Sequence, residues 1–153
     1  MSAVEDRGRL DSQKFVDPML TAGGDTRAFV KLTALETLWI NTGTLCNITC
    51  ANCYIESSPK NDRLTYISRA EVAAYLDEIE TDRLGTQLIG FTGGEPFMNK
   101  DLPAMLAISL ERGFNVLVLS NAMKSMEHRR SELLDFHERF GDRLSNRVSV
   151  EHH

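Results

Sequence analysis

The chain has 153 residues, of which 42% are hydrophobic and 25% charged, a balance typical of one globular domain. Its formal net charge of -5 argues against non-specific nucleic-acid binding, which depends on basic patches. No apolar stretch is long enough to cross a membrane, and the charged first ten residues lack the apolar core of a secretory signal. We therefore expect a cytoplasmic protein with neither a membrane nor a nucleic acid as partner.

The N-terminal part of the chain predicts an arm rather than a packed unit. Residues 1–25 are polar and contain Pro18 and Gly23–Gly24, which favour turns. The apolar residues Ala28–Leu32 form a possible short strand. We predict an N-terminal arm over residues 1–35 and a core domain over residues 36–153.

The core domain is predicted to open with a strand, a loop and a helix. Thr37–Ile40 is a β-branched and aromatic run that favours a strand. The polar residues Glu56–Arg63 then predict a loop. Ser68 and Glu71 have the spacing of a capping box, which marks the start of a helix. Apolar residues follow at helical spacing, at positions Val72, Tyr75, Leu76 and Ile79.

The rest of the chain alternates between strand and helix patterns. In order, these are a buried strand at Leu88–Phe91, a helix from Asp101 to Gly113, a strand at Asn115–Leu119, a helix containing Ser131–Phe140 and a strand at Arg147–Val150. Such alternation predicts parallel βα units. The carboxyl ends of parallel barrel strands meet on one face, so we expect the segments after the first three strands to converge there.

All three cysteines of the chain lie in one eight-residue window, at Cys46, Cys50 and Cys53. A disulfide framework needs an even number of cysteines, and a structural zinc site usually has four ligands. The next candidate ligand, His128, is distant and lies in a helical segment. Three thiolates hold three irons of a cubic iron–sulfur cluster and leave the fourth iron open to a small molecule. This spacing favours a cluster and leaves zinc as the alternative.

A second motif, Gly93-Gly94-Glu95-Pro96, follows directly after the predicted strand Leu88–Phe91 and Thr92. Glycines at a strand end let the backbone approach a ligand closely, and the carbonyls there accept hydrogen bonds from an ammonium group. Glu95 adds a negative charge at the same position. A tight turn before a helix produces the same pattern without any ligand.

Taken together, Cys46-x3-Cys50-x2-Cys53 and Gly93-Gly94-Glu95-Pro96 resemble the motifs of the radical S-adenosylmethionine (SAM) enzyme superfamily, in the N-terminal part of its core domain. The resemblance implies that the three cysteines bind a 4Fe-4S cluster. It also implies that the amine and carboxylate of SAM bind the open iron, with Gly93, Gly94 and Glu95 around the amine.

The chain departs from that family pattern at one position of the cysteine motif. The residue before the last cysteine is often aromatic in the family and packs near the adenine of SAM. Here that residue is Asn52, and an aromatic residue, Tyr54, follows the cysteine instead. The departure concerns the packing of the adenine and leaves the three cysteines unaffected.

The resemblance also implies a fold and an activity. The fold is α/β, a partial (βα) barrel reduced here to about four strands, so we expect an N-terminal fragment or a truncated member. The activity is that of an oxidoreductase: reductive cleavage of SAM gives a 5′-deoxyadenosyl radical that abstracts hydrogen from a substrate the sequence does not identify. An electron donor such as a flavodoxin or ferredoxin is the expected partner. The alternative is an iron–sulfur electron-transfer or accessory module, which would not need an amine-binding turn.

Three further residues are candidates for contact with SAM. Ser120 and Asn121 end the third predicted strand, where the family often has polar residues near SAM, although a helix N-cap and turn explains them equally well. Glu151 resembles an acidic residue that faces the ribose of SAM after the fourth strand. Glu151-His152-His153 also fits the remnant of a purification tag.

Overall fold

The computed structural model of the protein describes residues 16–149. The chain divides into two units, residues 1–33 and residues 34–153. Within the described residues, no helix is long and apolar enough to span a lipid bilayer. Every regular helix and strand of the described residues belongs to the second unit.

The described part of the first unit is a loop closed by its own hydrogen bonds. The Asp17 carboxylate accepts hydrogen bonds from the backbone N–H groups of Met19 and Leu20, at 2.7 and 3.0 Å. Leu20 and Thr26 form an isolated antiparallel bridge. The predicted short strand at Ala28–Leu32 is wrong, since these residues pair with no other strand in the described part of the chain.

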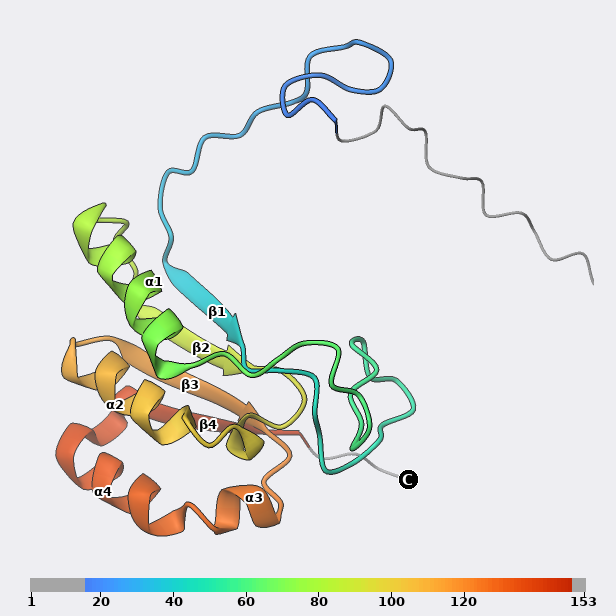
Figure 1. The fold of residues 1–153 in the computed structure, drawn as a ribbon. Helices are drawn as coiled ribbons and strands as arrows, with labels where there is room; N and C mark the ends of the chain where they lie inside the picture. The colour runs from blue at the N-terminus through green and yellow to red at the C-terminus, as the bar shows by residue number, and fades with distance from the viewer. Residues whose placement is uncertain (1–15, 150–153) are drawn as a thin grey trace, which may run out of the picture. The chain divides into compact units, whose positions relative to one another are not determined.

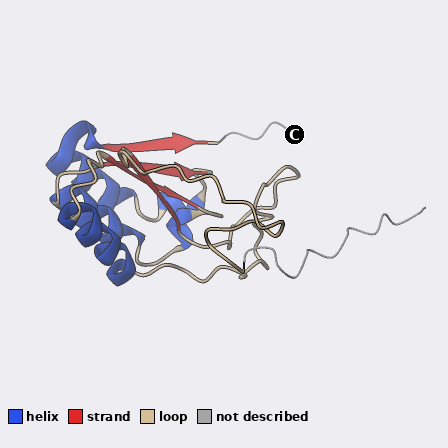
Figure 2. Cartoon of the chain, turned by 90° about the horizontal axis from the view of Figure 1, so that it is seen from above, coloured by secondary structure: helices blue, strands red, loops and turns tan. Residues whose placement is uncertain are grey.

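The second unit is built on a parallel sheet with the strand order β1-β2-β3-β4. The strands are β1 (Thr37–Asn41), β2 (Leu88–Thr92), β3 (Asn115–Ser120) and β4 (Leu144–Val148). The helices are α1 (Arg69–Thr81), α2 (Leu102–Glu111), α3 (Lys124–Glu127) and α4 (Arg130–Phe140), with single 3-10 turns at Pro96–Met98 and Gly141–Arg143. Right-handed crossovers between neighbouring strands place the helices on one face of the sheet (Figures 1 and 2). The predicted α/β partial barrel is confirmed.

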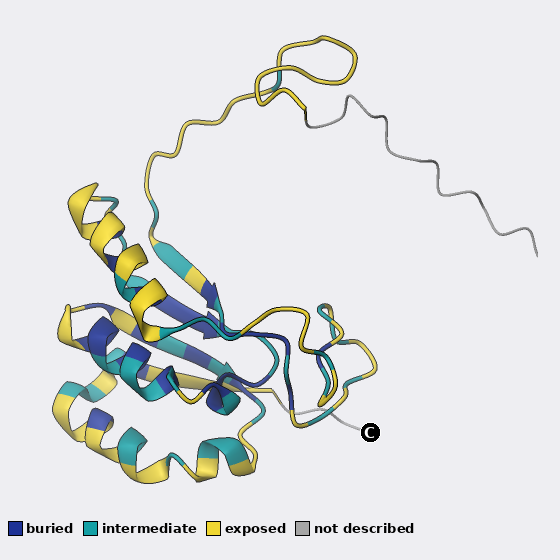
Figure 3. Ribbon diagram, viewed as in Figure 1, coloured by how far each residue is buried: buried dark blue, intermediate teal, exposed yellow. Residues whose placement is uncertain are grey.

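The hydrophobic core lies between the sheet and these helices, as the buried segments in Figure 3 show. In-register pairing sets Ile40 beside Phe91 and Phe91 beside Val118, so apolar side chains of neighbouring strands share one face. The central helix, α2, contributes most of the helical side of the core, with Leu102, Met105, Leu106, Ile108, Ser109 and Leu110 buried. The core therefore fixes the sheet whose carboxyl ends carry the motifs.

Local sequence signals set the helix ends. The Ser68 hydroxyl accepts a hydrogen bond from the Glu71 backbone N–H, and the Glu71 carboxylate accepts one from the Ser68 backbone N–H, so the predicted capping box is confirmed. Gly141 ends α4 with a φ of 61°, as expected for a glycine after a helix. Tyr75, although at helical spacing, is half exposed on α1.

The fourth strand begins earlier than its sequence predicts. It spans Leu144–Val148 rather than Arg147–Val150, with Leu144 paired to Val116. Only its first residue is buried, and the three polar residues that follow are exposed. Between Leu144 and Val148 its sequence therefore lacks the apolar residues that mark the other three strands. Val150 lies outside the described residues.

On the face of the sheet away from the core, the only tryptophan of the chain packs against a glycine. Trp39 on β1 is in register with Gly90 on β2 and is 47% exposed. A Cβ atom on Gly90 would lie 2.3 Å from the Trp39 ring. The close packing of this ring against β2 therefore depends on the missing side chain at Gly90.

Replacing Gly90 with alanine is expected to displace the Trp39 ring and to lower the free energy of unfolding by about 1–3 kcal/mol, the usual effect of overpacking. Urea unfolding followed by circular dichroism measures the loss, and the emission spectrum of the single tryptophan reports the displacement. In a Trp39→Ala background, Gly90→Ala should cost much less. An equal cost in both backgrounds would show that the ring is not the cause.

Candidate active site

The carboxyl ends of the strands surround a pocket of about 260 Å³. Its wall combines the loop after β1, the turn after β2 and the ends of β3 and β4. The lining residues are Cys46, Ile48, Cys50, Asn52, Cys53, Tyr54, Ser57, Thr92, Gly93, Gly94, Leu119, Ser120, Asn121 and Ser149. Three sequence motifs separated by up to about seventy residues therefore meet at one site, as expected for parallel strands.

The start of the cysteine loop is held against the end of β2 by backbone and side-chain hydrogen bonds. Thr42 donates from its backbone N–H and its hydroxyl to the Thr92 carbonyl, at 2.8 and 3.0 Å. The Asn41 side chain accepts a hydrogen bond from the Gly43 N–H at 2.9 Å. These bonds turn the chain as it leaves β1, so that the cysteines follow directly beside the next strand.

Gly93 and Gly94 are in close contact with that loop. The Gly94 N–H donates to the Gly43 carbonyl at 2.8 Å. A Cβ on Gly94 would lie 2.2 Å from the Leu45 carbonyl oxygen, and one on Gly93, at φ 138°, would lie 2.7 Å from the Gly43 carbonyl oxygen. The two glycines therefore admit the backbone of the cysteine loop, and both also line the pocket.

Glu95 lies behind the pocket wall. It is 1% exposed and is not among the residues that line the cavity. Its carboxylate accepts hydrogen bonds from the Ser120 hydroxyl at 2.9 Å, the Asn121 N–H at 2.9 Å and the Phe97 N–H at 3.1 Å. The side chain thus joins the turn after β2 to the end of β3, a structural role that the sequence does not reveal.

Asn121 connects the end of β3 to the cysteine loop. Its side-chain amide donates to the Asn47 side-chain oxygen at 2.8 Å and to the Cys46 sulfur at 3.7 Å. The next residue, Ala122, has a φ of 54°, an uncommon conformation for a residue with a side chain. The Ser120 hydroxyl accepts a hydrogen bond from the Ala122 N–H at 2.9 Å. This turn holds Asn121 beside the first cysteine.

The cysteines differ in their electrostatic surroundings. Burial raises the pKa of the Cys46 thiol, and the negative charges of Glu95 and Cys53 add to that increase. Burial also raises the pKa of Cys53, but hydrogen bonds from backbone N–H groups, that of Ser57 foremost, outweigh it and leave the pKa below its usual value. Cys53 is therefore the better prepared of these two to act as a thiolate ligand.

The donor set of the cysteine loop is three free thiols, the ligand type that iron–sulfur clusters take. Across residues 16–149, no group of three or more His, Cys, Asp or Glu residues is close enough together to hold one metal ion. In a cubic cluster each cysteine binds a different iron, so the sulfurs lie farther apart. The Ser57 hydroxyl is buried at the pocket wall, and its proximity to Cys53 helps to lower the pKa of that thiol. No protein group accepts a well-formed hydrogen bond from it within the described residues, so it can also bond to a molecule in the pocket.

The structure brings most of the candidate residues to this pocket. Its walls include the three cysteines, Gly93, Gly94, Ser120 and Asn121, whereas Glu95 lies behind them. Glu151 lies outside the described residues. Ser57 and Ser149 line the pocket but were missed by the sequence analysis. For Ser149 the missed signal is the true end of β4 at Val148, which places the following residue at the carboxyl edge.

Comparison with known proteins identifies the family. The Radical SAM superfamily model matches residues 40–149, and the chain belongs to this superfamily. Fe-coproporphyrin III synthase of Methanosarcina barkeri is 30% identical over 114 residues, which cover 72% of the chain and 25% of that protein. GTP 3′,8-cyclase of Rhodococcus opacus is 34% identical over 87 residues, covering 55% of the chain and 24% of that protein.

The fold agrees with this assignment. The crystal structure of Streptococcus suis SuiB bound to S-adenosylmethionine matches with a TM-score of 0.61 at 16% identity, covering 76% of the chain and 25% of SuiB. The chain spans about a quarter of the length of the relatives it matches. Members of the family use a 4Fe-4S cluster and SAM as cofactors.

Replacing Gly94 with alanine is expected to push the cysteine loop away from β2, because the new Cβ meets backbone rather than a movable side chain. We expect a loss of more than about 1 kcal/mol in the free energy of unfolding and a lower iron content after reconstitution. Gly23→Ala is the matched control, because a Cβ there makes only ordinary contacts, the nearest at 3.6 Å. Normal stability and iron content in Gly94→Ala would contradict this account of the glycine.

Proposed function

We propose that the chain binds a 4Fe-4S cluster through Cys46, Cys50 and Cys53, and SAM in the adjoining pocket, as part of a radical SAM enzyme. When bound, the cluster supplies the electron that cleaves SAM reductively to methionine and a 5′-deoxyadenosyl radical, which abstracts hydrogen from a substrate. The observation that carries the proposal is the shared pocket, in which the three cysteines face the turn after β2 and the end of β3.

The charges around the pocket favour a cationic ligand. Among residues 16–149, none of those that line it is a lysine, arginine or histidine. The buried carboxylate of Glu95 lies behind the wall, where its partners Ser120, Asn121 and Phe97 are neutral donors. SAM brings a positive sulfonium, which gains from a nearby negative charge in a site partly removed from water.

We assign the parts of SAM to the walls of the pocket as follows. The Gly93–Gly94 backbone receives the amine, because it ends a strand and lines the pocket without a side chain in the way. Tyr54 is exposed and is the aromatic residue among the lining residues, so its ring is the candidate surface for the adenine. Ser149 offers a hydroxyl at the end of β4, ahead of Glu151, which remains the candidate for the ribose.

A second function is favoured by one observation. Gly93 and Gly94 are required by the backbone of the cysteine loop, so the motif has a structural explanation that needs no SAM. An iron–sulfur electron-transfer or accessory module would use the same three cysteines and the same turn. The two functions differ in whether SAM changes the cluster, and this difference is measurable on the chain itself.

The proposed reaction also suggests an electron donor and a cellular compartment. Reductive cleavage consumes one electron, so we propose a low-potential donor such as a flavodoxin or ferredoxin as partner. A 4Fe-4S cluster held by reduced cysteines is compatible with the cytoplasm, which is the compartment we propose.

The first test is anaerobic reconstitution with iron and sulfide, followed by electron paramagnetic resonance of the dithionite-reduced chain with and without SAM. A 4Fe-4S signal that changes on addition of SAM is the expected result, because SAM would occupy the open iron. A cluster signal indifferent to SAM would reject SAM binding by this chain and favour the electron-transfer module. Zinc in place of iron would reject both.

Variants of the cysteines test the ligand assignment. Cys46→Ala, Cys50→Ala and Cys53→Ala should each lose most of the reconstituted iron and the characteristic signal, because a cluster with two protein ligands is poorly held. Thr49→Ala is the matched control, since Thr49 lies in the same loop, is exposed and does not line the pocket. An intact cluster in any of the three cysteine variants would refute that residue as a ligand.

A further inference from the structure

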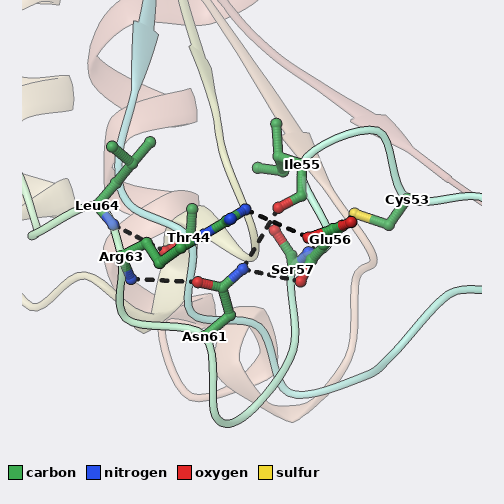
Figure 4. Close-up of polar contacts among 8 residues, drawn as sticks. All are labelled: Thr44, Cys53, Ile55, Glu56, Ser57, Asn61, Arg63 and Leu64. Carbon is green, nitrogen blue, oxygen red and sulfur yellow. Dashed lines mark hydrogen bonds and ion pairs between the residues drawn. The ribbon is translucent and has the colours of Figure 1, made fainter. Parts of the chain in front are cut away.

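The loop after the third cysteine is folded around one asparagine side chain, Asn61 (Figure 4). Its amide nitrogen donates to the carbonyl oxygens of Glu56 at 2.9 Å and Ile55 at 3.4 Å. Its amide oxygen accepts a hydrogen bond from the backbone N–H of Arg63 at 3.1 Å. Two carbonyls on one end and an N–H on the other fix the orientation of the amide, because only nitrogen donates and only oxygen accepts.

The peptide that Asn61 holds is the one that reaches the cysteine. The Glu56 carbonyl and the Ser57 N–H belong to a single trans peptide group and therefore point in opposite directions. On one side the carbonyl accepts from Asn61, and on the other the N–H donates to the Cys53 sulfur at 3.2 Å. A side chain eight residues from the cysteine thus sets the direction of the N–H that meets its sulfur.

Glu56 is also held by a hydrogen bond from its N–H to the Cys53 carbonyl at 3.0 Å, but that N–H belongs to the preceding peptide group. Glu56 has a φ of 53°, in the left-handed region, which is unfavourable for a residue with a side chain. The ion pair between Glu56 and Arg63 is 3.4 Å long and largely exposed, so it contributes little. Asn61, by contrast, is only partly exposed and makes three hydrogen bonds.

The rest of the loop is anchored to the start of the cysteine loop. The Leu64 N–H donates to the Thr44 hydroxyl at 3.1 Å, and the Cys46 N–H donates to the Ser58 carbonyl at 3.2 Å. Thr44 is buried, so this attachment is a fixed one. Asn61 lies between the two anchor points and connects them to the Ile55–Ser57 segment.

We propose that Asn61 is a positioning residue for the cluster ligand Cys53, acting through the Glu56–Ser57 peptide to hold an N–H···S hydrogen bond on its sulfur. Hydrogen bonds to a ligating sulfur stabilise the more negative, reduced state of a cluster and so raise its reduction potential. Asn61 would therefore make the cluster easier to reduce. The inference rests on the proposed function, since it assumes that Cys53 ligates the cluster.

Asn61→Ala tests the proposal, with Thr65→Ala as the matched control: both are neutral replacements in the same loop, and Thr65 is exposed. The first measurement is amide hydrogen exchange by nuclear magnetic resonance on the metal-free chain. In Asn61→Ala we expect the Ser57 amide to exchange about five- to thirtyfold faster, as for the loss of 1–2 kcal/mol of local stability. Unchanged amides in β2 and β3 would show that the fold is intact.

The second measurement is the reduction potential of the reconstituted cluster, from a redox titration followed by electron paramagnetic resonance. Asn61→Ala should have a lower potential than the parent chain, and Thr65→Ala should match the parent. If the exchange rate of the Ser57 amide is unchanged in Asn61→Ala, Asn61 does not hold the Glu56–Ser57 peptide and the proposal is overturned. If the Ser57 amide exchanges faster but the reduction potential of the cluster is unchanged, Asn61 holds the peptide without affecting the cluster, and that part of the proposal is overturned.

The two proposals fail separately. If the parent chain assembles no cluster, the proposed function fails, while the exchange of the Ser57 amide in the metal-free chain still decides whether Asn61 orients it. If Asn61→Ala alone fails to hold a cluster, the exchange data decide the cause. Faster exchange limited to residues 54–64 supports the positioning role, and faster exchange throughout the sheet overturns it in favour of general unfolding.

Discussion

The geometry of the site depends on one contact between backbones, that of the cysteine loop with the turn after β2. Gly94 donates to the Gly43 carbonyl at 2.8 Å, and the Glu95 N–H donates to the Leu45 carbonyl at 3.0 Å. These two bonds extend the pairing of β1 and β2 beyond the ends of the strands, directly before Cys46. Since a Cβ on Gly94 would overlap the Leu45 carbonyl, glycine at this position is a condition for the cysteines to lie beside the sheet.

The buried carboxylate of Glu95 extends this arrangement to the third strand. A carboxylate removed from water is costly unless its oxygens are hydrogen-bonded, and here Ser120, Asn121 and Phe97 all donate to it. Asn121 then reaches Asn47 and the sulfur of Cys46. The carboxyl ends of three strands are thus joined into one rim by polar bonds, above a core that is almost wholly apolar.

The sequence predicts the parts of this structure that obey a regular pattern. The capping box at Ser68, the strands β1 to β3 and the glycine after α4 all follow from local spacing. The exposed strand β4 has no apolar alternation, so its sequence predicts a start at Arg147, three residues after the observed start at Leu144. Ala28–Leu32 has strand-like composition but no partner strand within residues 16–149, and only the tertiary structure shows this. Likewise, spacing brings Glu95 to the site but does not tell which way its carboxylate faces.

Asparagine side chains hold the loops at this end of the sheet by hydrogen bonds to backbone groups, as backbone hydrogen bonds between strands hold the sheet. Asn41, Asn61, Asn99 and Asn121 each bond to backbone groups of loops that have no ladder partner. Asn99, 1% exposed, donates to the Ile67 carbonyl at 2.8 Å and accepts from the Asp101 N–H at 2.9 Å. An amide suits this position because it offers donors and an acceptor in one rigid group. It is also neutral, so it orders the loops around the cysteines without adding a positive charge that would compete with a cationic ligand for the same pocket.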